Sequence, residues 1–95
     1  MRRSPKFKDA NHAPLRTLWR SIGASWLDLI PIEGGEPDAL VGWRGQDRLV
    51  EVKDPNAPPS KRKPRAKQLA CHRSWKGRPV AVVLCFDVLL RLFEP

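Results

Sequence analysis

The sequence predicts a single α/β domain in which a mixed β-sheet is flanked by helices. The order of hydrophobic patterns along the chain is helix, three strands, helix, strand and helix, which is typical of helices packed on the faces of a sheet. A length of 95 residues suits one domain, and no internal repeat or second domain is visible. We expect residues 9–95 to form this domain and residues 1–8 to form a basic, flexible arm ahead of it.

Composition narrows the possible function classes. Eighteen Lys and Arg residues against ten Asp and Glu residues give a net charge of +8, which favours a polyanionic partner. Nucleic acid fits this charge better than a membrane surface, because no segment approaches a spanning length and no amphipathic stretch is uniformly basic. We therefore expect a nucleic-acid partner, no membrane partner and no small-molecule cofactor.

Targeting and cysteine signals are sparse. The positive charges of residues 1–8 are not followed by an apolar run, so we expect no secretory signal and a cytoplasmic location. Cys71 and Cys85 are too few for a disulfide framework, and no second pair of ligands stands at zinc-binding distance from Cys71 and His72 in the sequence. We expect no zinc site and two buried or half-buried thiols in a reducing compartment.

The first helix is predicted over residues 11–22. Four apolar positions fall at i, i+3, i+4 and i+7 on one stripe: Leu15, Leu18, Trp19 and Ile22. Gly23 ends the helix, and Asp9 or Asn11 can cap its start. A contact at the edge of a site is the alternative role of Asn11, and we expect His12 to be an exposed residue of the helix start.

A strand is predicted at residues 25–30, with Trp26 in the core or at a dimer contact. The loop after it contains Gly34 and Gly35. Two glycines could let the backbone come close to a substrate phosphate, although glycines in a loop usually mark only a turn.

Two segments of alternating hydrophobicity predict a β-hairpin: residues 37–44 and residues 47–53. Gly45-Gln46 lies between them and provides the glycine that a two-residue type II′ turn needs at its first central position. Counting outward from this turn gives three pairs: Arg44 with Asp47, Leu40 with Glu51, and Asp38 with Lys53. Because side chains alternate faces with a period of two, this register places Asp38, Glu51 and Lys53 on one face.

These three side chains match the chemistry of phosphodiester cleavage. As diagonal neighbours, Asp38 and Glu51 are close enough to hold one small cation, and Mg²⁺ commonly takes one or two carboxylates while keeping waters and substrate oxygens. The carbonyl of Val52 could add a neutral ligand, and Mn²⁺ is a second possibility for the ion. Lys53 would orient or deprotonate the attacking water, or counter charge on the phosphate; the sequence leaves these roles open.

The competing interpretation of these residues is a solvated strand face, on which Glu-x-Lys is commonplace. Leu40 and Leu49 share the face of the acids, however, so both strands have the pattern of elements buried on both faces. Buried carboxylates cost free energy unless they are paired or bound to metal. The catalytic interpretation is therefore favoured over the solvated face.

A proline-rich loop, residues 55–64, follows the hairpin and cannot enter the sheet. Five positive charges then fall within seven residues: Lys61, Arg62, Lys63, Arg65 and Lys67. Such a run is often only a solvated surface, but its place directly after the acids favours contact with the DNA backbone. It contains no interleaved aromatic residues, so we expect recognition of phosphate and shape without base stacking.

The second helix is predicted to begin at Pro64 and to end before Gly77. One face of it carries four residues: Gln68, Cys71, His72 and Trp75. An apolar strand at residues 80–86, covered on both faces, comes next, and Asp87 can cap a last short helix. We expect His72 to be a packing residue, and the leucines of the last helix, with Phe93, to form an interface.

The order of these motifs resembles the PD-(D/E)xK nuclease superfamily and, within it, the small stand-alone phage proteins of the VRR-NUC branch. The resemblance runs from about Asp9 to Phe93, and four motifs carry it: Asp9-Ala10-Asn11, Gly34-Gly35-Glu36-Pro37-Asp38, Glu51-Val52-Lys53-Asp54 and Gln68. It implies a restriction-endonuclease-like αβββαβ core and a metal-dependent endonuclease that acts on branched or flap DNA. It also implies that Gln68 points into the site, and that the chain is a homodimer like Holliday-junction resolvases.

The chain departs from the family pattern in its first helix. Many members carry a glutamate at the position of Pro14 and a glutamine at that of His12, so a helix-one acid is missing here. We predict a Mg²⁺-dependent endodeoxyribonuclease in phage or bacterial DNA replication, recombination or repair, working in the host cytoplasm if phage-encoded. A basic DNA-binding module that keeps the fold without cutting is the alternative, and a small RNA-binding protein is disfavoured by the paired acids.

Overall fold

The computed structural model describes residues 9–30 and 34–94. Its helices and strands, in chain order, are α1 (His12–Ser21), β1 (Ser25–Asp28), β2 (Ala39–Trp43), β3 (Gln46–Val52), the 3₁₀ helix η2 (Pro59–Lys61), α2 (Ala66–Ser74), β4 (Ala81–Val83) and α3 (Phe86–Arg91). This is the predicted order of elements, with most boundaries within three residues of the expected ones. The predicted basic arm, residues 1–8, lies outside the described residues.

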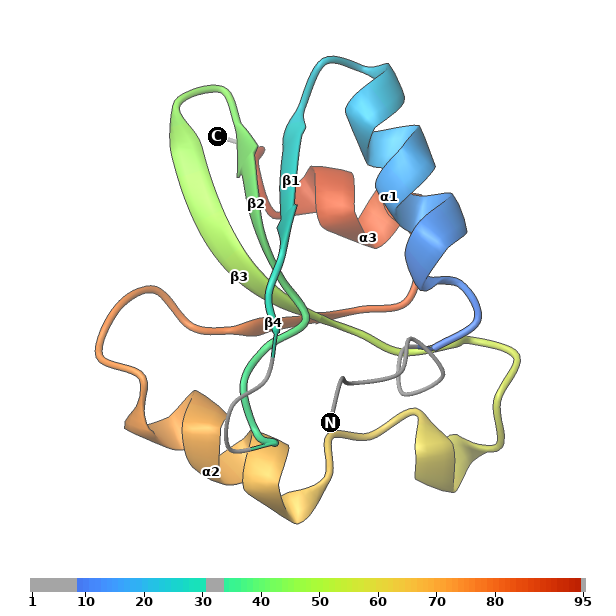
Figure 1. Cartoon of the computed structure of the whole chain (residues 1–95), viewed down its shortest axis with the longest axis vertical. Helices are drawn as coiled ribbons and strands as arrows, with labels where there is room; N and C mark the ends of the chain where they lie inside the picture. Colours follow the sequence, from blue (N-terminus) through green and yellow to red (C-terminus); the bar gives the residue numbers. More distant parts are fainter. Residues whose placement is uncertain (1–8, 31–33, 95) are drawn as a thin grey trace.

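The four strands form one mixed sheet in the order β1-β2-β3-β4, as Figure 1 shows. The first three are antiparallel neighbours, and β4 runs parallel to β3. A parallel neighbour requires a crossover connection, and α2 is that crossover. In Figure 1, α1 and α3 lie together, away from α2. Within the described ranges, no helix has the length and apolar character needed to cross a membrane.

One face of the sheet packs against α1 and α3 and forms the hydrophobic core. Strand alternation places Val41, Val50 and Val52 on this face, and each is at most 1% exposed. Trp19 of α1 is fully buried against them, and its ring lies 5.5 Å from that of Phe93. The core fixes which side of each strand faces inward, and therefore which side chains face the other way.

The turn of the predicted hairpin lies one residue earlier than expected. Arg44 and Gly45 both have positive φ, 55° and 77°, as a type I′ turn requires, so the predicted type II′ turn at Gly45-Gln46 is wrong. Trp43 therefore pairs with Gln46, and Leu40 pairs with Leu49 in place of Glu51. Each partner changes by two residues, so every side chain keeps its predicted face.

A partly buried cluster of polar side chains connects α1 to β1. Asp28 accepts hydrogen bonds from Trp26 Nε1 at 2.8 Å and from Arg16, and its Oδ1 lies 2.8 Å from His12 Nε2. Burial alone raises the pKa of Asp28, but the His12, Trp26 and Arg16 hydrogen bonds and the Arg16 charge outweigh it and lower the pKa to about 2. His12 is 4% exposed, so the expectation of an exposed His12 is wrong, because this cluster covers it.

Other expectations about exposure also fail. Leu89 and Phe93 of the C-terminal segment are at most 3% exposed and pack in the core, so the expectation that these two residues are exposed for an interface is wrong. Cys85 is exposed, whereas Cys71 is half-buried as expected. The last strand is a three-residue edge strand whose first two residues are only half-buried, because nothing pairs with its outer side among the described residues.

Candidate active site

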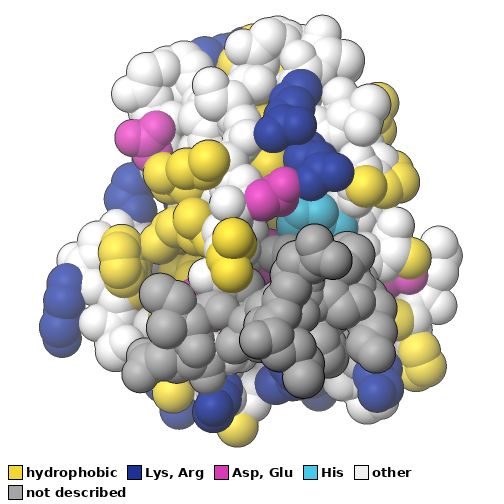
Figure 2. Space-filling model, in the orientation of Figure 1, with side chains coloured by type: hydrophobic (Ala, Val, Ile, Leu, Met, Phe, Trp, Pro, Cys, Tyr) yellow, Lys and Arg dark blue, Asp and Glu magenta, His cyan; other side chains and the backbone are white. Residues whose placement is uncertain are grey.

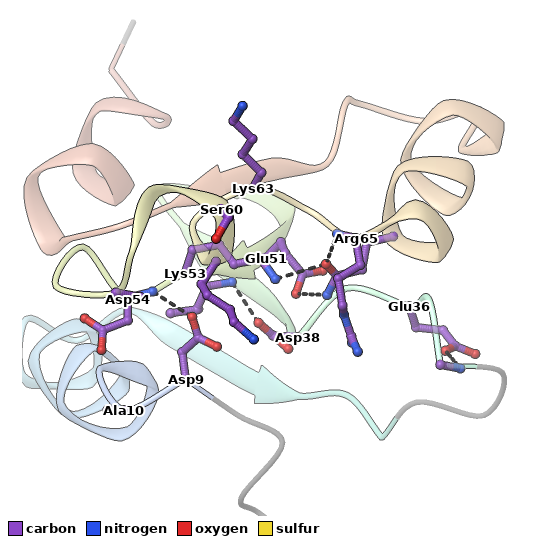
Figure 3. A pocket seen from close by; sticks show the side chains of 15 residues that line it. Asp9, Ala10, Glu36, Asp38, Glu51, Lys53, Asp54, Ser60, Lys63 and Arg65 are labelled. Atoms are coloured by element: carbon purple, nitrogen blue, oxygen red, sulfur yellow. Dashed lines mark hydrogen bonds between the residues drawn. The ribbon is translucent and has the colours of Figure 1, made fainter.

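A cavity of about 680 Å³ opens at one end of the sheet. It is lined by five residues that the sequence analysis selected: Asp38, Glu51, Val52, Lys53 and Gln68. They come from the approach to β2, from the end of β3 and from α2. Figure 3 shows Asp38, Glu51 and Lys53 close together, with Asp9 and Asp54 on one side and Arg65 on the other.

The period of β3 explains why Glu51 and Lys53 reach the cavity. Val50 and Val52 point into the core, so the residues between and after them, Glu51 and Lys53, point to the opposite face. There α2 covers them, and they are only 1% and 6% exposed. An acid and a lysine are thus held at core-like depth, where ionised groups require compensating contacts.

Gln68 supplies those contacts. Its Oε1 accepts hydrogen bonds from Lys53 Nζ at 3.0 Å and from the Arg65 backbone N–H at 2.8 Å. Its Nε2 donates to Glu51 Oε2 at 2.7 Å. Because two donors face one end of the amide and a carboxylate faces the other, the orientation of the amide is fixed. Gln68, which the family resemblance placed in the site, therefore connects Glu51 to Lys53.

Asp38 is held against the same strand. Its Oδ2 accepts a hydrogen bond of 2.7 Å from the backbone N–H of Val52, the residue between Glu51 and Lys53. Its own backbone N–H donates to the Val50 carbonyl at 2.9 Å. Asp38 thus stays beside β3 although it precedes β2, and the two acids that were expected to share a site line one cavity.

The donor set fits a small, hard divalent cation. Two carboxylates and a backbone carbonyl are oxygen ligands of the kind that Mg²⁺ takes, with water completing its coordination in an open cavity. Within residues 9–30 and 34–94, no group of three or more His, Cys, Asp and Glu side chains is arranged to hold a metal.

The start of α1 borders the cavity through residues that were expected to act as helix caps. Asp9 lines the cavity, and its Oδ2 accepts a 2.6 Å hydrogen bond from the Asp54 N–H. Asn11 makes no capping hydrogen bond with its side chain. Its Nδ2 donates instead to the carbonyls of Lys53 at 3.0 Å and Leu84 at 3.2 Å, so it ties together the ends of β3 and β4. The alternative role of Asn11, a contact at the site edge, describes it better.

The basic side chains of residues 61–67, which follow β3, do not all lie in the same place. Lys61, Lys63 and Arg65 line the cavity beside the acids. Arg62 is half-buried outside it, and Lys67 lines a separate hollow next to α2. Three of the five predicted DNA contacts are therefore positioned at the mouth of the site.

Gly35 serves the packing of α2. A Cβ at this position would lie 2.6 Å from the Lys67 carbonyl oxygen, closer than real Cβ atoms come to backbone. The loop and the helix can approach this closely only because Gly35 has no side chain. The close approach that the structure shows at Gly35 is to α2, the helix that carries Gln68.

His72 also reaches the site, although the sequence indicated only a packing role. Its Nε2 lies 3.7 Å from Glu51 Oε1, and its side chain is 12% exposed. Burial lowers the pKa of His72, and the positive charge of Lys53 lowers it further. The spacing of four residues from Gln68 was the available signal, but it could not be separated from ordinary helix packing.

Comparison with known proteins adds one structural relative. No family model and no curated protein sequence matches the chain. A solved structure described as "VRR_NUC domain" matches with a TM-score of 0.61 and 32% sequence identity. The match covers 84% of this chain and 89% of the other.

Proposed function

The chain belongs to the VRR-NUC family, a branch of the PD-(D/E)xK-like nucleases with a restriction-endonuclease-like fold, and on this premise we propose that it is a metal-dependent DNA endonuclease. The observation that carries the proposal is the convergence of Asp38, Glu51 and Lys53 in one cavity, which Lys61, Lys63 and Arg65 also line. Family membership supplies the reaction class, and these residues supply the groups that the reaction needs.

The residues have distinct roles in the proposed reaction. Asp38, Glu51 and the Val52 carbonyl would hold Mg²⁺, or Mn²⁺ in its place. When bound, the ion lowers the pKa of a coordinated water and offsets charge on the phosphate. Lys53 gives one of its three ammonium hydrogens to Gln68, which leaves hydrogens for the attacking water or a phosphate oxygen. Gln68 keeps both the acid and the lysine in place.

The proposed substrate is structured DNA, such as a Holliday junction, another branched DNA or a flap, in replication, recombination or repair in the cytoplasm of a bacterium or a phage host. Lys61, Lys63 and Arg65 would contact the backbone beside the acids. Among the described residues that line the cavity none is aromatic, so these groups suit recognition of phosphate and shape better than of base identity.

We further propose a homodimer with two active sites. On the face of the sheet opposite the core, Leu27 pairs with Leu40, which pairs with Leu49, so three leucines form a row across β1, β2 and β3. Leu27 is 59% exposed and Ile30, just beyond β1, is 77% exposed. Figure 2 shows hydrophobic side chains gathered over the strands, and such a surface is typical of an interface.

The test is cleavage of labelled four-way junction, flap, single-stranded and linear duplex DNA, with and without Mg²⁺. We expect the branched substrates to be cut only with metal, and Asp38→Ala to bind them but not to cut them. Asp87→Ala, an exposed acid on α3, is the matched control and should cut normally. Binding without cleavage by the wild-type protein under all metal conditions would instead favour a non-catalytic DNA-binding module, the alternative that the missing helix-one acid at Pro14 supports.

A further inference from the structure

One helix presents two side chains to the two oxygens of a single carboxylate. Gln68 and His72 are four residues apart on α2, so they lie on the same face, one turn from each other. Gln68 Nε2 donates to Glu51 Oε2 at 2.7 Å, and His72 Nε2 lies 3.7 Å from Glu51 Oε1. The contact of Gln68 with Glu51 is a hydrogen bond whose role is described above, whereas the contact of His72 with Glu51 has not yet been given a role.

A histidine suits this position chemically. Around Glu51, whose side chain is 2% exposed, an N–H group that faces the carboxylate reduces the cost of burying the charge. A neutral imidazole carries one N–H and one acceptor nitrogen, so the tautomer with its proton on Nε2 directs a donor at Oε1. A separation of 3.7 Å is a contact longer than a hydrogen bond, and hydrogen bonds of active sites often tighten only when the site is loaded.

We propose that His72 is a positioning residue of the metal site: with its proton on Nε2, it holds Oε1 of Glu51 while Gln68 holds Oε2, and together they fix the rotation of the carboxylate. The inference rests on the proposed function, because it concerns the ligand that Glu51 would provide.

The test measures Mn²⁺ binding to the protein without DNA. Binding is monitored by electron paramagnetic resonance, in which the signal of the free ion is lost when the ion binds. Groups that orient a metal ligand through a hydrogen bond typically change metal affinity by about 10–100-fold. We expect His72→Leu to weaken Mn²⁺ binding by about tenfold and His72→Gln, whose amide nitrogen reaches the position of Nε2, to restore most of it. His72→Asn, whose amide reaches only the position of Nδ1, should bind as weakly as His72→Leu.

Ser74→Leu is the matched control, because Ser74 is exposed on the same helix and its side chain bonds only the Cys71 carbonyl. Its Mn²⁺ binding should equal that of the wild type. If His72→Leu folds poorly, the comparison of the Gln and Asn variants decides, because both replace the imidazole with an amide. Long-range ¹H–¹⁵N spectra of the wild type should show a proton on Nε2 of His72, the nitrogen that faces Glu51.

The outcomes separate this inference from the proposed function. Equal Mn²⁺ binding by wild type, His72→Gln and His72→Asn, together with metal-dependent cleavage by all three, would overturn the role of His72 and leave the nuclease intact. Absence of both Mn²⁺ binding and cleavage in the wild type would overturn both. Weakened binding in His72→Asn and recovery in His72→Gln would support the inference whatever DNA structure the enzyme prefers.

Discussion

At the end of β3, the two sides of the strand are buried to a similar depth with opposite chemistry. Toward α1 and α3, Val50 and Val52 are at most 1% exposed among apolar neighbours. Toward α2, Glu51 is 1% exposed and Lys53 6%, and hydrogen bonds to Gln68 hold them. Adjacent residues of one strand thus alternate between a hydrophobic core and a polar site. The difference teaches that the side facing α1 and α3 supplies most of the stability. On the side facing α2, burying the charged groups of the site costs free energy of folding.

The attachment of α2 reflects this division. Gln68 is the one buried residue of α2, and it contacts the sheet through the acid and the lysine of the site. No residue of α2 belongs to the hydrophobic core among the described residues. The helix that completes the site is therefore held by the site itself, so changes on the two faces should affect different observables.

The largest expected effect on stability is on the core face. Trp19→Ala removes a fully buried ring that packs near Trp43, Phe86 and Phe93, and should lower the free energy of unfolding by about 3–5 kcal/mol. Urea unfolding followed by circular dichroism measures this loss. Leu18→Ala, at a neighbouring position that is 51% exposed, should cost less than about 1 kcal/mol. Equal losses in the two variants would contradict the assignment of the core.

On the other face, Glu51→Gln should separate activity from stability. The amide keeps the shape of the side chain but removes the charged metal ligand, so cleavage should fall by about a hundredfold or more, equivalent to about 2.7 kcal/mol. Removing this buried charge relieves its own desolvation cost but leaves the Lys53 charge buried without it, so we expect the free energy of unfolding to change by less than in Trp19→Ala. Single-turnover cleavage and urea unfolding of the same preparation make the comparison. A variant that is destabilised like Trp19→Ala would show that the two faces do not divide as described.

Gly35→Ala should disturb the attachment of α2. The new Cβ would lie 2.6 Å from the Lys67 carbonyl oxygen, so the helix or the loop must shift, at a cost of about 1–3 kcal/mol. Urea unfolding should show this loss, and cleavage should fall because Gln68 moves with the helix. Adding Lys67→Ala should not restore stability, because the clash involves the backbone. Recovery in the double variant would place the clash on the Lys67 side chain instead.

The smallest expected effect on stability concerns the polar cluster between α1 and β1, formed by His12, Arg16, Trp26 and Asp28. The folded pKa of Asp28 is about 2, below the ordinary 3.8, so its contribution to stability is complete above pH 3.8 and is lost as the pH falls toward 2. Asp28 is partly exposed, so we expect only about 1 kcal/mol. Asp28→Asn should flatten this part of the stability curve measured by urea unfolding between pH 5 and 2, whereas Asp87→Asn should not. An unchanged slope in Asp28→Asn would contradict the lowered pKa.

Much of the fold could be predicted from local sequence patterns, because helices and strands each space their apolar residues with a characteristic period. The αβββαβ order and the shared face of Asp38, Glu51 and Lys53 were predictable in this way. Contacts between distant segments were not. Asn11 has the residue type of a cap, yet it bonds the ends of β3 and β4, and His72 has the spacing of a packing residue, yet it faces Glu51. Only the folded arrangement distinguishes these roles.

The hairpin turn at Arg44 and Gly45 has a consequence for how such a gene can change. Loss or gain of one codon in each arm moves the bend but returns Asp38 and Glu51 to the same side, because the pleat repeats every two residues. A single-codon insertion or deletion in one arm turns one acid away from the other. Relatives should therefore vary in hairpin length by equal insertions or deletions in the two strands. Relatives with a change in only one strand should have lost cleavage, or should contain a β-bulge that returns both acids to the same face.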